Sequence, residues 1–345
     1  MQLPNLSNLR AKNFLQKNSR SKAGFFLGLM GLLGLAAGLF YWGTRVETRR
    51  YRLEKLKVKV NGHPASDGRS LSILHISDLH LHGDDDHKVE FIRSITDADY
   101  DLVVLTGDVF EFLDGLKYGA QLLTRKPRLG AYAVFGNHDY YDYSIFNKTM
   151  GRIWRQHRHP AQRNNVEPHR IALEAGGFKV LVNESVYIKE ADLFIVGVDY
   201  PGISQSKLHT VMQNAPEGSL KLALFHLPKK LEMLVEAGFD MAFGGHTHGG
   251  QIRVPGYGAL ITDSDLHRRH ASGLFTLCGD NRCTHFHISR GLGADPRSNI
   301  RIFCPPAATV IELTCSSEVQ ANGLRYGKKS AAEKKAAPAN ELATG

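Results

Sequence analysis

Residues 71–80 read Leu-Ser-Ile-Leu-His-Ile-Ser-Asp-Leu-His, an apolar run that ends at two polar side chains, Asp78 and His80. The length of the run and its Leu and Ile content predict a short, buried β-strand. Residues 102–108 repeat the pattern, since Leu-Val-Val-Leu-Thr is followed by Gly107 and Asp108. In open α/β sheets the ends of such strands line a shared crevice. The two runs therefore predict an α/β domain with a polar site at the strand ends.

Elements of the same kind continue along the chain. Strands are predicted over residues 53–60, 131–135, 179–182, 185–188, 193–198, 222–225, 240–243, 285–289 and 309–313, and helices over residues 87–96, 114–124 and 228–237. Short buried strands that alternate with helices, followed by hairpin-like strands, are typical of two sheets covered by helices. We assign this domain, of α/β (α+β) class, to residues 53–315, a length that buries a sizeable core.

Five short motifs follow predicted strands, and each carries side chains of the kind that bind metals. They are Asp78-Leu79-His80, Gly107-Asp108, Gly136-Asn137-His138-Asp139, Phe225-His226 and Gly245-His246-Thr247-His248-Gly249. Carboxylate oxygens and imidazole nitrogens suit Mn²⁺, Fe and Zn²⁺ alike. Two ions need at least one shared ligand, and Asp108 is the natural bridge because a carboxylate places a full negative charge between two cations. One such motif alone is more often structural, but five in this order predict a site for two divalent metal ions.

The ordered set of motifs resembles the calcineurin-like metallophosphoesterase family, whose pattern is D-x-H, G-D, G-N-H-[DE], H and G-H-x-H. The resemblance extends over residues 71–313 and implies a four-layer sandwich of two mixed sheets between helices. It also implies how the ligands are shared: Asp78, His80, Asp108 and His248 on one ion, and Asp108, Asn137, His226 and His246 on the other. Residues 107–111 end in Glu111 where the family usually has Asp, a minor departure that leaves the expected ligands complete.

The resemblance further implies the hydrolysis of a phosphoester. Hydroxide held between the two ions is expected to attack phosphorus in line. The family assigns the role of general acid to the histidine that matches His138. Because His138 is adjacent to Asn137, it can face the leaving-group oxygen, and Asp139 or another carboxylate could orient it.

A longer stretch resembles one bacterial branch of this family. The similarity is carried by residues 245–255 and by Ser289-Arg290-Gly291-Leu292-Gly293. Members of this branch follow an N-terminal membrane or export segment; some hydrolyse UDP-2,3-diacylglucosamine, a glycolipid diphosphate, and others are broad phosphodiesterases. We therefore expect a membrane-associated phosphate or glycolipid diphosphate as the substrate. The alternatives are a phosphodiesterase or phosphatase for soluble or envelope substrates and, from a different class, a metal-binding membrane module without activity.

The charge of the chain agrees with anionic partners. The formal net charge is +9, which suits anionic lipid, nucleic acid or a phosphorylated small molecule. The sequence lacks an aromatic-rich platform on which bases could stack. Membrane lipid and a phosphorylated small molecule or glycolipid are therefore the expected partners, and nucleic acid is not.

An apolar segment lies near the N-terminus. Residues 23–43 carry no charge, and about 20 such residues cross a bilayer as a helix because every backbone polar group is then satisfied internally. A cleaved signal peptide is the alternative, but no clean small-x-small cleavage site follows the run. The expected organisation is a basic tail (1–22), a transmembrane helix (23–43), a basic juxtamembrane linker (44–52), the domain (53–315) and a disordered tail (316–345).

Orientation in the membrane is weakly determined. Both flanks of the apolar segment are basic, so the positive-inside rule acts in both directions. The downstream flank is denser in Arg and Lys, which slightly favours a cytoplasmic domain attached to a bacterial inner membrane by a single span. The pairs Gly24/Gly28 and Gly34/Gly38 have the GxxxG spacing of helix dimers, a weak indication of a homodimer.

Residues 143–170 interrupt the alternation of strands and helices. They begin with a helical apolar pattern and become rich in arginine. A long connection beside a catalytic turn is often functional, so we expect a lid whose Arg152 and Arg155 hold a second phosphate. A peripheral helix with a solvated basic face is the alternative. Arg253, Arg268, Arg269 and Arg290 lie near the motifs and are weaker phosphate-binding candidates.

The four cysteines give little information about a site. Cys278 and Cys283 lack the CxxC spacing of a zinc ribbon, and Cys304 and Cys315 are isolated. We expect buried or free thiols, with a disulfide as the alternative.

Overall fold

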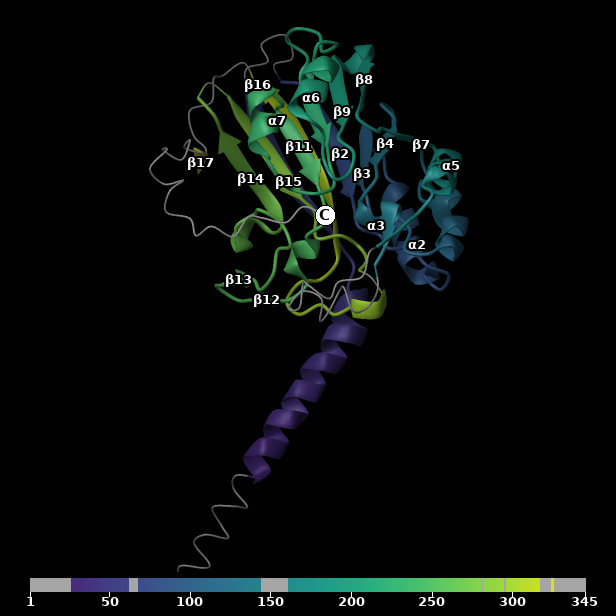
Figure 1. Cartoon of the computed structure of the whole chain (residues 1–345), viewed down its shortest axis with the longest axis vertical. Helices are drawn as coiled ribbons and strands as arrows, with labels where there is room; N and C mark the ends of the chain where they lie inside the picture. Colours follow the sequence, from purple (N-terminus) through teal and green to yellow (C-terminus); the bar gives the residue numbers. More distant parts are fainter. Residues whose placement is uncertain are drawn as a thin grey trace, which may run out of the picture.

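The apolar runs of the sequence form two mixed β-sheets in the computed structural model, which describes residues 26–61, 68–143, 161–280, 282–294, 296–316 and 324–325 (Figure 1). The first sheet contains, in spatial order, β1 (Arg52–Asn61), β16 (Ala307–Ser316), β2 (Ser70–Ile76), β3 (Leu102–Thr106), β4 (Ala131–Val134) and β7 (Phe178–Val180). Strand β16 is antiparallel to β2 and parallel to β1, whereas β2, β3, β4 and β7 are parallel to one another.

The second sheet follows in the chain. In spatial order it contains β17 (Leu324–Arg325), β14 (Gly273–Cys278), β15 (Cys283–Ile288), β11 (Met241–Gly244), β10 (Leu220–Leu224), β9 (Leu193–Gly197) and β8 (Glu184–Ile188). Its centre is parallel, and antiparallel strands flank it on both sides. Short two-stranded ribbons pair β5 (Tyr141–Asp142) with β6 (Gln162–Arg163), and β12 (Arg253–Val254) with β13 (Gly258–Ala259).

Helices cover the outer face of each sheet. The first sheet packs against α2 (Asp86–Thr96), η4 (Leu113–Gln121) and α5 (Glu167–Ala175), and the second against α6 (Gln205–Met212) and α7 (Glu232–Glu236). A separate apolar cluster lies between the sheets, where Ile73 and Val104 meet Leu222 and Phe243. The result is the four-layer sandwich of helices, sheet, sheet and helices, so the predicted fold class is confirmed.

Several elements differ from those predicted. The helix expected over residues 114–124 is the 3₁₀ helix η4, in which Cβ atoms at Gly115 and Gly119 would overlap the carbonyl oxygens of Leu81 and Ala172. The helix expected over residues 228–237 is limited to α7. Strand β14 and helices α5 and α6 were not predicted, because the apolar residues of the two helices are few and those of β14 do not alternate with polar ones.

A single long helix projects from the domain at its N-terminal end (Figure 1). It covers the 24 residues Phe26–Arg49, and its apolar side chains are almost wholly exposed. By length and composition it could cross a membrane, a test that signal sequences also meet. Its last part is the π-helical turn η1 (Trp42–Val46) followed by the 3₁₀ turn η2 (Glu47–Arg49).

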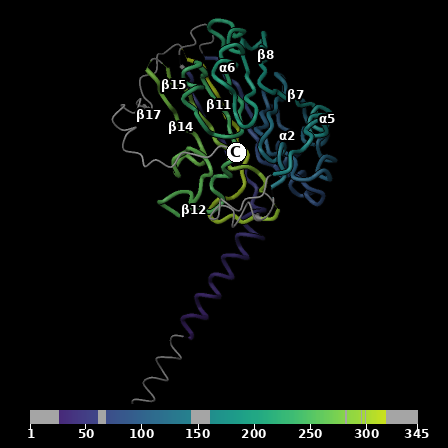
Figure 2. Tube along the Cα trace, viewed as in Figure 1, coloured from purple at the N-terminus to yellow at the C-terminus, as the bar shows by residue number. Residues whose placement is uncertain are grey.

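The end of this helix is docked on the domain. Gly43, Glu47 and Thr48 are buried, and the Gly43 carbonyl accepts a hydrogen bond of 2.9 Å from the backbone N–H of Arg301. The segment predicted as a basic linker is therefore helical as far as Arg49, and β1 begins at Arg52. Figure 2 shows the long helix running into the domain.

The cysteines were only partly predicted. Cys278 and Cys283 face each other at the ends of β14 and β15 and form a disulfide, so the expectation of free thiols is wrong for this pair. Cys304 and Cys315 are free and buried, as expected.

Candidate metal centre

The structure brings the seven predicted metal ligands together between the two sheets. Asp78 and His80 follow β2, Asp108 follows β3, Asn137 begins the short helix α3 (Asn137–Tyr140) after β4, His226 follows β10, and His246 and His248 follow β11. All lie beyond the carboxyl ends of parallel strands, where an α/β sheet forms its crevice. Asp78, His80, Asp108 and His226 are at most 1% exposed, whereas His246 and His248 are partly exposed, so only part of the site is open to solvent.

The backbone of these turns is strained. Five of the seven residues have a positive φ: Asp78 (50°), His80 (43°), Asp108 (53°), His246 (71°) and His248 (49°). A residue with a Cβ pays of the order of 1–3 kcal/mol for such a conformation, and such residues cluster at functional sites. Neighbouring glycines make room for them: a Cβ at Gly136 would overlap the Asp108 carboxylate, and one at Gly245 would overlap the hydroxyl oxygen of Ser77.

The candidate metal ligands form two groups, and Asp108 belongs to both. In the first group, Nε2 of His80 lies 3.3 Å from Nε2 of His248 and 3.7 Å from Oδ2 of Asp108. Nε2 of His248 lies 3.6 Å from Oδ1 of Asp78. These four residues offer ligand atoms within 4.8 Å of one another.

The second group is equally tight. Nε2 of His226 lies 3.2 Å from Oδ2 of Asp108 and 3.0 Å from Oδ1 of Asn137. Nδ1 of His246 lies 2.8 Å from the same Asn137 oxygen. The two groups match the distribution that the family resemblance implies, with Asp108 in both.

Hydrogen bonds behind the histidines determine which nitrogen faces the centre with a lone pair. The other ring nitrogen, Nδ1, lies 2.8 Å from the Thr106 carbonyl in His226 and 3.0 Å from the Gly293 carbonyl in His248. In His80 it lies 2.7 Å from Oε2 of Glu111. Since these oxygens only accept, each Nδ1 is the donor, and a neutral ring then presents an unprotonated Nε2 to the centre.

Lone pairs therefore face lone pairs at this site. The Nε2 atoms of His80 and His248 approach to 3.3 Å, and that of His226 approaches an amide and a carboxylate oxygen. Acceptors repel one another unless a cation or a proton lies between them. The donor set, with imidazole, carboxylate and amide groups held by a second layer of hydrogen bonds, fits two divalent ions.

The pKa values of His226 and Asp108 show the same demand for positive charge. Burial alone would lower the pKa of His226, but the Asp108 charge outweighs burial and raises the pKa to about 9. Burial and the neighbouring His226 charge lower the pKa of His246 to about 4. Burial opposes the ionisation of Asp108, yet the surrounding histidines hold its pKa well below the ordinary value. A proton on His226 thus supplies positive charge where a bound cation would supply it.

His138 is oriented by Glu111. Its Nδ1 lies 3.0 Å from Oε2 of Glu111, the same oxygen that contacts His80, and its ring is 13% exposed. The other oxygen of Glu111 lies 2.6 Å from the Arg297 guanidinium. Burial would raise the pKa of Glu111, but hydrogen bonds from His138 and His80 hold it far below the ordinary value. The residue that the sequence marked only as a departure from the family pattern therefore links a candidate ligand to the candidate general acid.

Asp139 has a different role from the one considered in the sequence. Its carboxylate accepts hydrogen bonds from the backbone N–H groups of Asp108 (2.9 Å), Val109 (3.1 Å) and Gly136 (2.8 Å), and it is fully buried. It therefore fixes the strained turn of Asp108 against the turn of Asn137. Of the two alternatives given for the carboxylate that orients His138, Asp139 or another, the structure therefore favours another, Glu111, which lies 3.0 Å from Nδ1 of His138.

A buried chain of polar side chains reaches the site from the space between the sheets. Nδ1 of His287 on β15 lies 2.7 Å from Nδ1 of His75 on β2, and Nε2 of His75 lies 2.9 Å from the Thr106 hydroxyl. The Thr106 hydroxyl donates to the Ser77 hydroxyl, which lies 2.6 Å from Asp78 as its donor. Neither histidine was predicted as a functional residue, because both lie inside apolar runs.

Arg301 supports the other side of the site. It is 1% exposed, and its guanidinium donates to the carbonyls of Gly293 (2.8 Å) and Arg290 (2.9 Å). The Gly293 carbonyl is the acceptor that orients His248. The backbone N–H of Arg301 binds Gly43 of the long helix, so one buried residue joins that helix to the candidate metal centre.

The structure describes only some of the predicted phosphate-binding arginines. Arg152 and Arg155 lie outside the described residues, as does most of the predicted lid. Arg290 forms an ion pair with Glu54 of β1. The end of the lid segment forms β6 and the start of α5, where the side chain of His169 is buried. Phosphate binding by these arginines stays a prediction.

Comparisons with known proteins agree with this geometry. The family model described as calcineurin-like phosphoesterase matches residues 71–250. The metallophosphoesterase YkoQ of Bacillus subtilis is 29% identical to this chain, over 84% of the chain and 100% of its own length. UDP-2,3-diacylglucosamine pyrophosphatase LpxG of Chlamydia muridarum is 24% identical, over 84% of this chain and 97% of its own length. Phosphodiesterase YaeI of Escherichia coli is 28% identical, over 62% of this chain and 70% of its own length.

Proposed function

Since the chain belongs to the calcineurin-like phosphoesterase family and is a hydrolase of phosphoester bonds, we propose that it uses two divalent metal ions to cleave a membrane-associated phosphate or glycolipid diphosphate. The observation that carries this proposal is the pair of convergent groups in which imidazole nitrogens and carboxylate or amide oxygens lie 2.8–3.7 Å apart, among them the Nε2 atoms of His80 and His248, which face each other without a proton. Such an arrangement is costly in the bare protein and favourable around cations.

The ligands have distinct tasks. Asp78, His80, Asp108 and His248 would hold one ion, and Asp108, Asn137, His226 and His246 the other. When bound, two such ions supply a Lewis acid and an activated water molecule for attack on phosphorus. The carboxylate of Asp108, fixed by the N–H of His138 at 2.8 Å, is the charge shared by both groups.

His138 is proposed as the general acid. Its Nδ1 is engaged by Glu111 at 3.0 Å, which leaves Nε2 to serve the leaving-group oxygen. The Glu111 carboxylate accepts from Nδ1 and fixes the ring, and the proton on Nε2 is the one to be transferred. Its partial exposure, equal to that of the His248 side chain at 13%, gives the substrate access to it.

A lipid-linked substrate is supported by two observations. One is the similarity to LpxG, whose name gives UDP-2,3-diacylglucosamine as its substrate. The other is the apolar helix, which would anchor the domain within its own width of a bilayer. A glycolipid diphosphate of the UDP-2,3-diacylglucosamine type is therefore the preferred substrate class.

A broad phosphodiesterase is the second candidate. The similarity to YaeI, a phosphodiesterase by name, supports this reading. The described site also has few charged groups that would select one leaving group, since Arg290 and Arg297 are both paired with carboxylates.

The face of the membrane remains part of the proposal. The dense basic flank favours the cytoplasmic face, whereas the Cys278–Cys283 disulfide favours an oxidising compartment outside it. Protease added to spheroplasts should cleave the domain only if the domain is outside. A homodimer through the helix stays a prediction from its glycine spacing.

One assay tests the function. The full chain in detergent should hydrolyse bis(p-nitrophenyl) phosphate with added Mn²⁺ and lose this activity with a chelator. Activity that survives complete metal removal would contradict the proposal. Turnover of UDP-2,3-diacylglucosamine against a panel of simple esters then separates the two candidate substrate classes.

A further inference from the structure

Large apolar side chains are exposed at one end of the domain. We call them the apolar rim: Val254 (43% exposed), Tyr257 (49%), Leu260 (54%), Ile261 (54%) and Phe303 (63%). Four of them lie in or next to the ribbon of β12 and β13, and Phe303 lies in the neighbouring segment. Single exposed apolar residues are ordinary, but several in adjoining segments indicate an interaction site.

The apolar rim is joined to the end of the long helix. The backbone N–H of Arg253 on β12 donates to the Ile302 carbonyl at 3.0 Å. The preceding residue, Arg301, donates to Gly43 of the helix at 2.9 Å, and a Cβ on Gly43 would lie 3.0 Å from the Ile302 side chain. The ribbon, the 301–303 segment and the foot of the helix are thus one connected surface.

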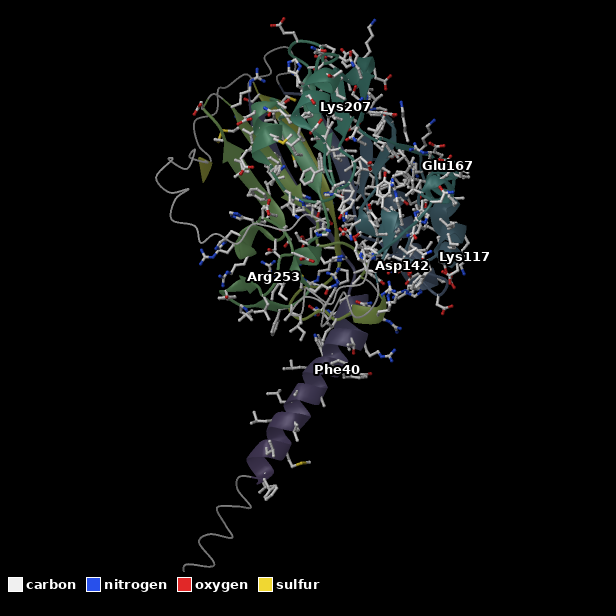
Figure 3. The ribbon with its side chains drawn as sticks, in the orientation of Figure 1. Phe40, Lys117, Asp142, Glu167, Lys207 and Arg253 are labelled. Carbon is white, nitrogen blue, oxygen red and sulfur yellow. A yellow bond between two sulfur atoms is a disulfide. The ribbon has the colours of Figure 1, made fainter. Side chains whose placement is uncertain are left out.

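The figures show the same arrangement. Strands β12 and β13 lie at the end of the domain from which the helix projects, whereas β8 lies at the opposite end (Figure 1). Arg253, on β12, is labelled at the helix end of the domain, and Phe40 marks the last turns of the helix just beyond it (Figure 3). Glu167, which begins α5, lies farther from the helix.

A bilayer is the occupant that this position favours. Tyr41 and Trp42 are exposed at the domain end of the apolar helix, where amphipathic rings prefer the membrane–water interface. The apolar rim is connected to the next residue of the helix, Gly43, through the backbone of residues 301–302. The Arg268 guanidinium lies 4.0 Å above the Tyr257 ring, and Arg269 is exposed next to it. Cations beside exposed apolar groups are typical of proteins that lie on anionic membranes.

We propose that the apolar rim inserts into the interfacial layer of the membrane that the helix crosses, as a second contact that fixes the tilt of the domain. This inference rests on the proposed membrane anchor. It gives the candidate metal centre a defined approach to the lipid surface, because β12 begins five residues after His248 and Arg301 orients the carbonyl that binds His248. The substrate class that fits is a phosphate carried by a lipid that stays in the bilayer.

The test measures depth in the membrane with the full chain in vesicles of phosphatidylethanolamine and phosphatidylglycerol. Leu260→Cys carries an NBD fluorophore in one sample, and Ile171→Cys, on α5, carries it in the matched control, since Ile171 is 60% exposed. The native free cysteines are buried, and the other two form a disulfide, so labelling is selective. Nitroxide-bearing phospholipid should quench the label at position 260 several-fold more than the label at position 171.

Three results would overturn the inference. Equal quenching at the two positions would mean that the apolar rim does not enter the lipid. A label at Leu33→Cys, within the helix, that is not quenched would remove the anchor and the inference with it. Cross-linking of two chains through the cysteine introduced at position 260, without quenching there, would make the apolar rim a contact between copies. Hydrolysis of bis(p-nitrophenyl) phosphate, measured separately, decides the proposed function, so the two ideas can fail independently.

Discussion

The two sheets bring different chemistry to the centre between them. Turns of the first sheet supply both carboxylates, Asp78 and Asp108, together with His80 and Asn137. Turns of the second sheet supply only imidazoles, from His226, His246 and His248. The supporting carboxylates, Glu111 and Asp139, also follow strands of the first sheet. The first sheet therefore determines the charge of the site, and the second completes its geometry with neutral donors.

This division explains why each of the two candidate ion sites needs both sheets. Each convergent group contains residues from both sheets, and Asp108 is the residue common to the two groups. Two divalent ions carry four positive charges, and the first sheet supplies the full negative charges that balance part of them. Substitutions that remove charge from the first sheet should accordingly lower turnover more than substitutions that remove a single neutral ligand.

The largest effect is expected for Asp108→Asn. The change removes the only charge that lies in both groups while its size is preserved, so both ions should be lost or weakly held. Charge stabilisation by the ions amounts to several kcal/mol, and each 1.36 kcal/mol is tenfold in rate, so turnover should fall about 10³-fold or more. Metal content by mass spectrometry and turnover of bis(p-nitrophenyl) phosphate measure this. His226→Asn is the matched change in the second sheet and should spare one ion; equal losses in the two variants would refute the division.

His138→Ala should come next. The ring contacts Glu111 at 3.0 Å and is not one of the seven candidate ligands, so metal content should stay at the wild-type level. Loss of a general acid typically costs about 10²–10⁴-fold, and the cost should be greatest for esters with poor leaving groups. A series of aryl phosphodiesters of increasing leaving-group pKa measures this dependence. Wild-type turnover of an ester with a poor leaving group would defeat the assignment.

Glu111→Gln should have a moderate effect. Oε2 of Glu111 contacts both His80 (2.7 Å) and His138 (3.0 Å), so the amide would keep the shape and lose the charge that orients two rings. Changes behind metal ligands typically cost about 10–100-fold in affinity or activity. Mn²⁺ titration of activity separates the two contributions, since weaker binding reports on His80 and lower turnover at saturating metal reports on His138. Glu111→Asp is the control that keeps the charge, and it should retain more activity than Glu111→Gln; the reverse order would show that length rather than charge matters.

The sequence predicts those features of the two sheets and of the site that depend on a local sequence pattern. Apolar runs ending at Asp78, Asp108 and His246 predict strands and the convergence of their ends, because parallel strands direct their carboxyl ends to one edge. Glu111 could be seen in the sequence, yet its role depends on the chain after β3 folding back along Leu81, whose carbonyl accepts from the Glu111 N–H at 2.9 Å. That contact joins two distant segments and has no local signal.

Residues buried against expectation could not be predicted in the same way. His75 and His287 occupy positions in apolar strands, and only the packing of one sheet on the other brings their Nδ1 atoms to 2.7 Å. Arginine is usually a surface residue, but the guanidinium of Arg301 is buried and donates to four backbone carbonyls. In each case the partner comes from another sheet or loop, so the long-range fold rather than the local sequence determines the role.

The smallest effect on chemistry, and a clear effect on stability, is expected for Asp139→Asn. Its carboxylate binds the N–H groups of Asp108, Val109 and Gly136 and contacts no reacting group. In the amide, an NH₂ group replaces one carboxylate oxygen and donates instead of accepting. If the remaining oxygen keeps the bonds from Asp108 and Gly136, the buried N–H of Val109 has no acceptor. An unsatisfied buried donor costs about 1–3 kcal/mol, so the free energy of unfolding should fall by that amount in denaturant titrations of the metal-free chain. Turnover at saturating Mn²⁺ should fall less than in Glu111→Gln.

Asp265→Asn, a change of an exposed acid, is the control and should leave stability unchanged. If Asp139→Asn instead abolished turnover while stability stayed at the wild-type level, Asp139 would act in the reaction. The distinction between residues that supply charge to the metal centre and residues that only hold its backbone turns would then be wrong.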